Sequence, residues 1–320
     1  MGLVRRFDHV GITVSDLAGS IAFFEALGLE LDGPSASIEG DFLDTVIGMT
    51  DAATEIVMLR APGGDTTVEL GVARRCRAGM PTMAVLGLRA WRSRSTPRAA
   101  VLVAGTASSG LGRYEDLWPV RGPDGIIVAR PSASAPITRR ARPARRGATP
   151  TIRVLSRVGR LRQDGAMGLV RRFDHVGITV SDLAGSIAFF EALGLELDGP
   201  SASIEGDFLD TVIGMTDAAT EIVMLRAPGG DTTVELSAFV RPGAEQGMPD
   251  AMANVLGLRS VAFEVDDLDA AVDAVGALGY GVVGGLGRYE DLWRMAYVRG
   301  PDGIIVALAQ RLGAGLAEGS

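Results

Sequence analysis

The sequence predicts an α+β fold built from βαβββ modules, each a strand, a helix and three further strands. Two observations carry this prediction. A block of 70 residues occurs twice, because Met1–Leu70 and Met167–Leu236 are identical. Within the block, apolar residues first alternate with period two and then recur with helical spacing, which is typical of a strand followed by a helix.

The opening elements of the block can be placed from their polar and glycine residues. In the second copy, residues 173–180 have one apolar and one polar face, which predicts a strand. Ser181 or Asp182 can cap the following helix through a side-chain oxygen, and Gly194 is positioned to end it.

The rest of the block predicts a hairpin after a mobile stretch. In the first copy the mobile stretch is Gly33–Asp51. The hairpin strands are Thr54–Arg60 and Thr66–Leu70, joined by a Pro-Gly-Gly-Asp turn. We therefore interpret residues 1–70 as a duplicated first half-module.

The pattern breaks immediately after the first copy. Residues 71–109 contain no acidic residue and no sustained period of 2 or 3.6. A shift of reading frame explains this, because Arg89–Thr96 corresponds, one base out of frame, to the segment that begins at Arg259. The normal frame returns at residues 110–118, which match Gly285–Trp293, and is lost again after Ala129. The first copy is therefore interpreted as a damaged duplicate.

Residues 71–166 thus form a frame-disrupted, basic and largely irregular segment. They carry 19 Arg against four Asp and Glu, although the whole chain has a net charge of −8 and no Lys. Residues 130–166 are rich in Arg, Pro and Ala, as expected of a disordered linker. A nucleic-acid surface is the alternative, but the Arg are not interleaved with aromatic residues, so no nucleic-acid partner is expected.

Residues 167–310 predict one complete domain of two βαβββ halves, followed by a flexible tail at 311–320. The helix of the second half begins after Asp266 or Asp267 and has an apolar stripe. The expected elements after the shared block are the strands Thr232–Phe239 and Leu258–Val265, the helix Leu268–Leu278, and the short strands Gly281–Val283, Arg294–Arg299 and Ile304–Ala309.

Composition excludes several other classes. No apolar run approaches the roughly 18 residues that span a bilayer, so no membrane partner is expected. The N-terminus lacks the apolar core of a signal peptide, which predicts a cytoplasmic protein. The single cysteine, Cys76, excludes an intrachain disulfide framework. With two His and one Cys, a Ser-His-Asp or Cys-His hydrolase is poorly supported.

Three segments of the second copy resemble one known family. They are Asp174–Gly177 (DHVG), Leu256–Val275 (LGLRSVAFEVDDLDAAVDAV) and Met295–Leu308 (MAYVRGPDGIIVAL). Together they resemble the vicinal oxygen chelate superfamily, which contains glyoxalase I, methylmalonyl-CoA epimerase, extradiol dioxygenases and bleomycin-resistance proteins. Over about residues 172–310, the resemblance implies a cupped mixed sheet, a small-molecule ligand and self-association as a homodimer.

The resemblance also implies a divalent metal (Zn, Ni, Co, Mn or Fe), held by the first and fourth strands of each half. His175 and Glu235 occupy these positions in the first half, and Glu235 would also move a proton. The second half departs from the pattern with Ser260 and Ala307. Glu264 is an alternative ligand. Equally, His175 could be a buried pocket histidine, and Glu235 a carboxylate on the pocket wall.

The duplication adds a further alternative. Pairing the first half of one copy with the first half of the other would bring His9 and Glu69 to His175 and Glu235.

Seven further residues are candidates for contacting a substrate. Arg226 and Arg299 could bind a carboxylate or phosphate, or be solvated arginines at strand ends. The full set is Met224, Arg226, Ser260, Tyr289, Trp293, Tyr297 and Arg299.

Two functions remain open. The favoured one is a metal-dependent lyase or isomerase, glyoxalase- or epimerase-like, acting on a small oxygenated metabolite. The alternative is a metal-free binding protein of the bleomycin-resistance type, which the absence of metal ligands at Ser260 and Ala307 favours.

Overall fold

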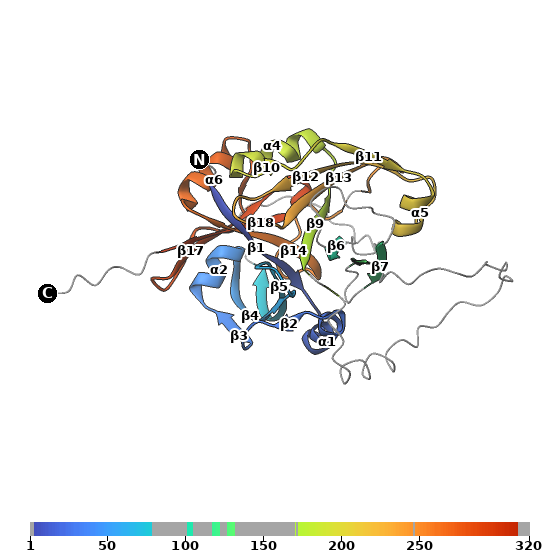
Figure 1. Cartoon of the computed structure of the whole chain (residues 1–320). Helices are drawn as coiled ribbons and strands as arrows, with labels where there is room; N and C mark the ends of the chain where they lie inside the picture. Colours follow the sequence, from blue (N-terminus) through green and yellow to red (C-terminus); the bar gives the residue numbers. More distant parts are fainter. Residues whose placement is uncertain are drawn as a thin grey trace, which may run out of the picture.

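The computed structural model describes residues 3–78, 101–104, 117–121, 127–131, 170, 172–245 and 247–312. These residues form two curled, mixed β-sheets with helices packed on the outside (Figure 1). The α+β class predicted from the sequence is therefore confirmed.

The elements follow the βαβββ pattern in both copies. The first copy contains β1 (Val4–Thr13), α1 (Leu17–Leu27), β2 (Glu30–Leu31), β3 (Ala36–Glu39), α2 (Asp41–Ile47), β4 (Met49–Arg60) and β5 (Thr67–Ala78). Between the copies lie β6 (Val101–Ala104), β7 (Leu117–Arg121) and β8 (Ile127–Pro131).

The second copy repeats the first and then continues into a second half. It contains β9 (Phe173–Thr179), α4 (Leu183–Leu193), β10 (Glu196–Leu197), β11 (Ala202–Glu205), α5 (Asp207–Ile213), β12 (Ala219–Arg226) and β13 (Thr233–Arg241). The second half contains β14 (Gly257–Val265), α6 (Leu268–Gly276), β15 (Gly281–Val282), β16 (Gly287–Tyr289), β17 (Trp293–Arg299), the 3-10 turn η4 (Pro301–Gly303) and β18 (Ile305–Arg311).

The expected helix caps are present in both copies. In α4, Asp182 accepts a hydrogen bond from the backbone N–H of Gly185 at 3.0 Å, so Asp182 rather than Ser181 is the cap. The helix ends at Gly194, whose φ of 101° lies in the left-handed region that favours glycine.

The first sheet joins two segments that are far apart in the sequence. Its strand order is β15-β17-β18-β14-β1-β5-β4-β2. At its centre β1 pairs antiparallel with β14, with Val10 opposite Val261. The first half of copy one is therefore completed by the second half of copy two.

The second sheet joins the remaining segments, in the order β10-β12-β13-β9-β6-β8-β7. Strand β9 pairs antiparallel with β6, which lies parallel to β8. The order β6-β8-β7 repeats that of β14-β18-β17 in the first sheet. Residues 71–166, expected to be largely irregular, thus contribute β6, β7, β8 and the end of β5, and the rest of that segment lies outside the described residues.

The pairing of the halves differs from the sequence-based expectation. The two halves of residues 167–310 lie in different sheets and do not close on each other. The alternative of pairing the two first halves is not found either, because β1 and β9 are also in different sheets. The physical reason is that β1 and β9 have the same sequence, so strand chemistry alone does not decide which of them pairs with β14.

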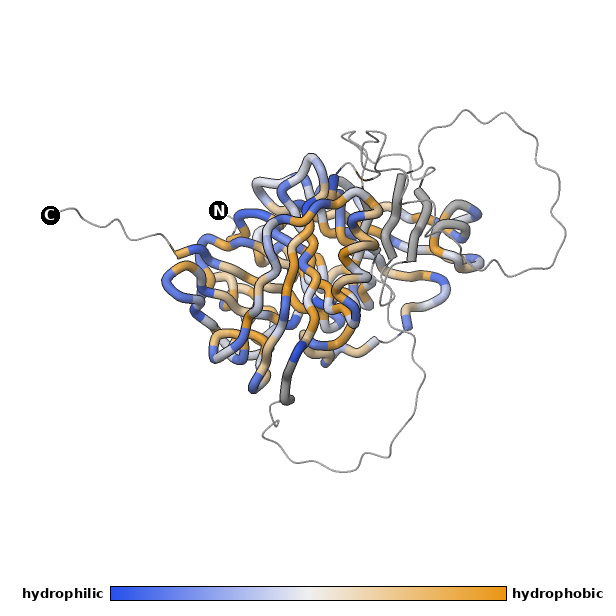
Figure 2. The backbone as a smooth tube through the Cα atoms, turned by 90° about the horizontal axis from the view of Figure 1, so that it is seen from below, coloured by the Kyte–Doolittle hydropathy of each residue, from blue (hydrophilic) through white to orange (hydrophobic). Residues whose placement is uncertain are grey.

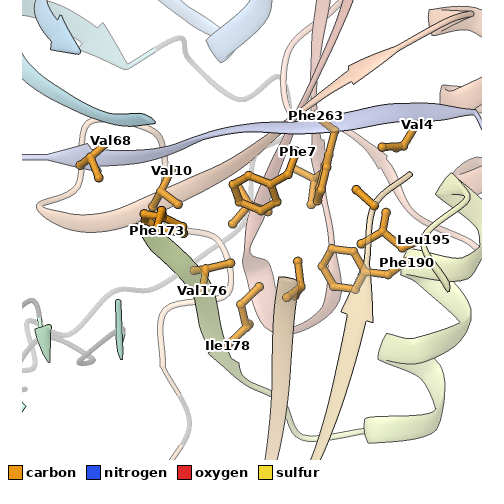
Figure 3. Close-up of a cluster of buried hydrophobic side chains, with 14 of the residues drawn as sticks. Val4, Phe7, Val10, Val68, Phe173, Val176, Ile178, Phe190, Leu195 and Phe263 are labelled. Carbon is orange, nitrogen blue, oxygen red and sulfur yellow. The ribbon is translucent and has the colours of Figure 1, made fainter. Parts of the chain in front are cut away.

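The apolar core contains buried residues of both copies (Figure 3), and hydrophobic stretches of the chain run through the middle of the molecule (Figure 2). Phe7 makes an edge-on contact with Phe263, with ring centroids 5.1 Å apart. Phe7 also stacks at 6.3 Å on Phe173, its own counterpart in the second copy. Likewise Thr66 Oγ1 lies 2.8 Å from Oγ1 of its counterpart Thr232. Equivalent residues in contact place the two copies around an approximate two-fold axis.

Candidate functional site

A cavity of about 80 Å³ lies against the first sheet, with room for several water molecules. Its walls come from β1, α2, β4 and β5 of the first copy and from β14 and β17 of the second, with the loop at Ala253 and Asn254. Most of the lining is apolar, and its ionisable side chains are Glu69, Arg259 and Tyr297. The exchange of halves thus creates a site that contains residues of both copies.

Strand register explains why the polar groups converge here. Gly11 on β1 lies between Glu69 on β5 and Ser260 on β14. A Cβ atom at Gly11 would collide with Ser260 Oγ, so a glycine is required for the two neighbouring strands to present their side chains side by side.

His9 lies on β1, close to Glu69 on the neighbouring strand β5. Its Nδ1 lies 2.9 Å from Asp8 Oδ2, and its Nε2 lies 3.8 Å from Glu69 Oε2. Burial lowers the pKa of His9, but the hydrogen bond with Asp8 and the negative charge of Glu69 outweigh burial, so the pKa is raised. The pair therefore favours a protonated imidazole beside the Glu69 carboxylate.

Two other polar groups complete the cavity wall. Burial, together with the nearby charge of Glu69, raises the pKa of Tyr297, so its phenol remains a hydrogen-bond donor. Arg259 donates to the backbone carbonyl of Leu256 at 3.0 Å. Burial lowers the pKa of this guanidinium.

The second copy repeats the histidine arrangement in the second sheet. His175 is buried, with Nδ1 3.1 Å from Asp174 Oδ2 and Nε2 3.6 Å from Glu235 Oε2. Burial lowers the pKa of His175, but the Asp174 hydrogen bond and the charge of Glu235 raise it overall. Glu235 also accepts a hydrogen bond from Ser237 Oγ at 2.9 Å, whereas Gly71 holds the corresponding position beside Glu69.

The residues present do not fit a tightly held metal ion. Two atoms bound to one zinc ion lie about 3 to 3.5 Å apart, so each His–Glu pair could supply two ligands. However, the described residues contain no group of three or more His, Cys, Asp or Glu that could hold a metal. The alternative ligand Glu264 is engaged by Arg5 at 3.3 Å and by Arg6 at 2.9 Å.

Of the seven substrate-contact candidates, Ser260 and Tyr297 line the cavity. Two others occupy structural positions nearby. Tyr289 lies against Phe42 of α2, with ring centroids 5.2 Å apart, and Trp293 pairs with Tyr289 across the β16–β17 ladder.

The remaining three candidates are placed elsewhere. Met224 lies on β12 in the second sheet, opposite Glu235. Arg226 binds Asp198 on the surface at 2.5 Å. Arg299 donates to the backbone carbonyls of Pro249 and Ala251 at 2.8 and 2.9 Å, so it holds the loop before β14.

Sequence reasoning did not assign Arg259 to the site, and it considered Glu69 only in the alternative pairing of the two first halves. The signal for Arg259 was its place directly before Ser260. The signal for Glu69 was its identity with Glu235 in the repeat.

Among the described residues, every helix is too short or too polar to cross a membrane. No curated protein matches this sequence.

Comparison with known families and structures gives matches to one family model and to many solved structures, among them the two that follow. The model of the Glyoxalase/Bleomycin resistance protein/Dioxygenase superfamily matches residues 172–308. A glyoxalase family protein from Bacillus cereus is 38% identical, over 44% of this chain and 95% of that one, with a TM-score of 0.42. Glyoxalase I from Zea mays is 16% identical and shares the fold, with a TM-score of 0.51 over 95% of this chain and 92% of that one. The chain therefore belongs to the glyoxalase, bleomycin-resistance and dioxygenase superfamily.

Proposed function

We propose that the cavity of the first sheet is the functional site, and that it binds a small oxygenated molecule without a tightly held metal ion. One observation supports this proposal above all. The mostly apolar cavity is lined by Glu69, Arg259, Ser260 and Tyr297, while the described residues contain no group of three metal-ligating side chains. A mostly apolar pocket with a few convergent polar groups is typical of small-molecule sites.

The polar groups divide into donors and an acceptor. Tyr297 keeps its proton because burial and Glu69 raise its pKa, so it can donate to a ligand oxygen. The Ser260 hydroxyl can donate or accept. Glu69 is the acceptor and the candidate proton acceptor, the role that the sequence assigned to its copy Glu235.

A second candidate is a metal-dependent lyase or isomerase acting on a small metabolite. It is supported by the His–Glu spacing, 3.8 Å at His9 and Glu69 and 3.6 Å at His175 and Glu235. A zinc, nickel, cobalt, manganese or iron ion there would need a third ligand from outside the described protein groups. Cytoplasmic localisation and self-association as a homodimer also stay predictions.

Metal analysis of the purified 320-residue chain separates the two candidates. Less than about one-tenth of an equivalent of any transition metal after dialysis supports metal-free binding. A near-stoichiometric metal content contradicts it.

The duplicated sequence supplies a matched pair of variants for the same experiment. If a metal is found, His9→Gln and His175→Gln show which sheet holds it, because each changes the same residue in the same local sequence. Loss of metal in His9→Gln alone assigns the ion to the cavity.

A further inference from the structure

Arg259 is the cation of the cavity wall, and its charge is not matched by a protein anion in the described part of the chain. The guanidinium donates to the backbone carbonyls of Leu256 at 3.0 Å and of Gly257 at 3.5 Å. These bonds use Nη2 and Nε and leave the N–H groups of Nη1 for another acceptor. Burial without a compensating charge lowers the pKa of Arg259.

Glu69, the other charged side chain of the cavity, has a partner within the protein. Glu69 lies against the imidazole of His9, a side chain 12% exposed, with Oε2 and Nε2 3.8 Å apart. By contrast, the charges of two arginines on β1 are matched, because Arg5 and Arg6 both bind Glu264. A half-buried guanidinium beside an apolar cavity loses hydration, and a ligand anion would replace it.

We propose that the ligand of the cavity carries a carboxylate, which binds the Arg259 guanidinium. This inference rests on the proposed function, since it names the chemical class of the ligand for the same site. A guanidinium holds a planar carboxylate through paired N–H groups, and such charge-assisted bonds are stronger than neutral ones.

The cavity also restricts the remainder of the ligand. Its volume of about 80 Å³ has room for several non-hydrogen atoms, and most of its lining is apolar. Ser260 and Tyr297 line the same cavity, where they can hold a second oxygen, such as a 2-oxo or 2-hydroxy group. The ligand class is thus a small carboxylic acid with a second oxygen, for which a 2-oxo acid is the simplest probe.

Calorimetric titration of the full chain with pyruvate and with butane-2,3-dione tests this inference. The dione replaces the carboxylate of pyruvate with a neutral group of similar shape. Pyruvate is expected to bind at least about tenfold more tightly than the dione, because charge-assisted hydrogen bonds contribute more than neutral ones. Arg259→Gln should remove this difference, and Arg259→Lys should retain part of it.

Controls separate binding from folding. Arg226→Gln makes the same change at a surface ion pair in the second sheet and should leave pyruvate binding unchanged. Thermal unfolding of each variant shows whether the loss of the Leu256 contact has disturbed the fold, and Arg259→Lys keeps a cation if Arg259→Gln unfolds.

Two results would overturn the inference, and they have different consequences for the proposed function. If the dione binds as tightly as pyruvate and Arg259→Gln changes neither, the carboxylate assignment fails while the cavity remains a binding site. If acetate, lactate, pyruvate and the dione all fail to bind, the carboxylate assignment and the proposed function fail together.

Discussion

The two copies of the 70-residue block are one sequence in two structural surroundings. The first copy is paired with the intact strands β14, β18 and β17, and the second is paired with the short strands β6, β8 and β7. Arg6 donates through Nε to Glu264 at 2.9 Å, whereas Nε of its counterpart Arg172 is buried and has no partner among the described residues. Identical residues therefore make different contacts, and the partner half determines which of them are satisfied.

The glutamates show the same principle at the functional site. Glu69 lines the cavity, and the position two residues later is Gly71. Glu235 is held by the hydroxyl of Ser237, the residue at the same position after the second block. The difference between Gly71 and Ser237, at the first position after the repeat, thus leaves one carboxylate at a cavity and engages the other with a neighbour.

The largest difference between the copies is expected at a phenylalanine of the first helix. Phe189 is fully buried and packs against Tyr280 at 4.7 Å, whereas Phe23 is half-buried. Phe189→Ala should lower the free energy of unfolding by about 3 to 5 kcal/mol, because it opens a core cavity, and Phe23→Ala by clearly less. Urea denaturation of both variants measures this, and equal losses would contradict the different packing of the two helices.

A smaller difference is expected at a helix-ending glycine. Gly48 and Gly214 both have left-handed backbones, with φ of 67° and 70°. A Cβ at Gly48 would lie 2.7 Å from the carbonyl oxygen of Val283, but one at Gly214 would have no described atom within 4 Å. Gly214→Ala should cost about 1 kcal/mol for backbone strain, and Gly48→Ala about 2 to 3 kcal/mol. Chemical denaturation compares them, and equal costs would argue against α2 packing on the β15–β16 turn.

The different contacts of Arg6 and Arg172 lead to a third prediction. Arg6→Met should destabilise the protein by about 1 to 2 kcal/mol, because it removes a partner of the buried Glu264 carboxylate. Arg172→Met should cost less, because it also removes a buried N–H that has no acceptor in the described part of the chain. Paired thermal unfolding curves test this, and a larger loss for Arg172→Met would count against the second-sheet pairing.

The two histidines are expected to behave alike, which gives the smallest difference between copies. Both pKa values are raised above the unfolded value of about 6.5, so each histidine contributes stability that is complete below that pH. This contribution is lost as the pH rises through the folded pKa. His9→Gln and His175→Gln should each flatten the fall in stability as the pH rises above about 6.5, by a similar amount. A flattening seen in one variant alone would mean that the two His–Glu pairs are not equivalent.

Much of the fold could be predicted from local patterns. Asp182 and Gly194 delimit a helix whose apolar residues recur with helical spacing, and apolar and polar residues alternate along β9. By contrast, the stretch Gly33–Asp51, expected to be mobile, contains β3 and α2. Its short helix begins at a glycine cap without a side-chain hydrogen bond, so the sequence carried no capping signal.

The candidate site was only partly predictable. Ser260 and Tyr297 were identified from the family pattern, and both line the cavity. His175 and Glu235 were chosen over His9 and Glu69 because one chain segment was expected to close its own sheet. Two identical strands compete for one partner, and that choice depends on long-range packing which no local pattern encodes.

Cross-linking of β14 tests the exchange of halves most directly. With Cys76 replaced by serine, the pair Val10→Cys and Val261→Cys places two cysteines on opposite residues of β1 and β14. The pair Val176→Cys and Val261→Cys uses the equivalent residue of β9, which lies in the other sheet. The structure predicts an efficient disulfide in the first pair and none in the second, measured by mass spectrometry of peptides. A disulfide formed through Val176→Cys instead would contradict the shared cavity and the account built on it.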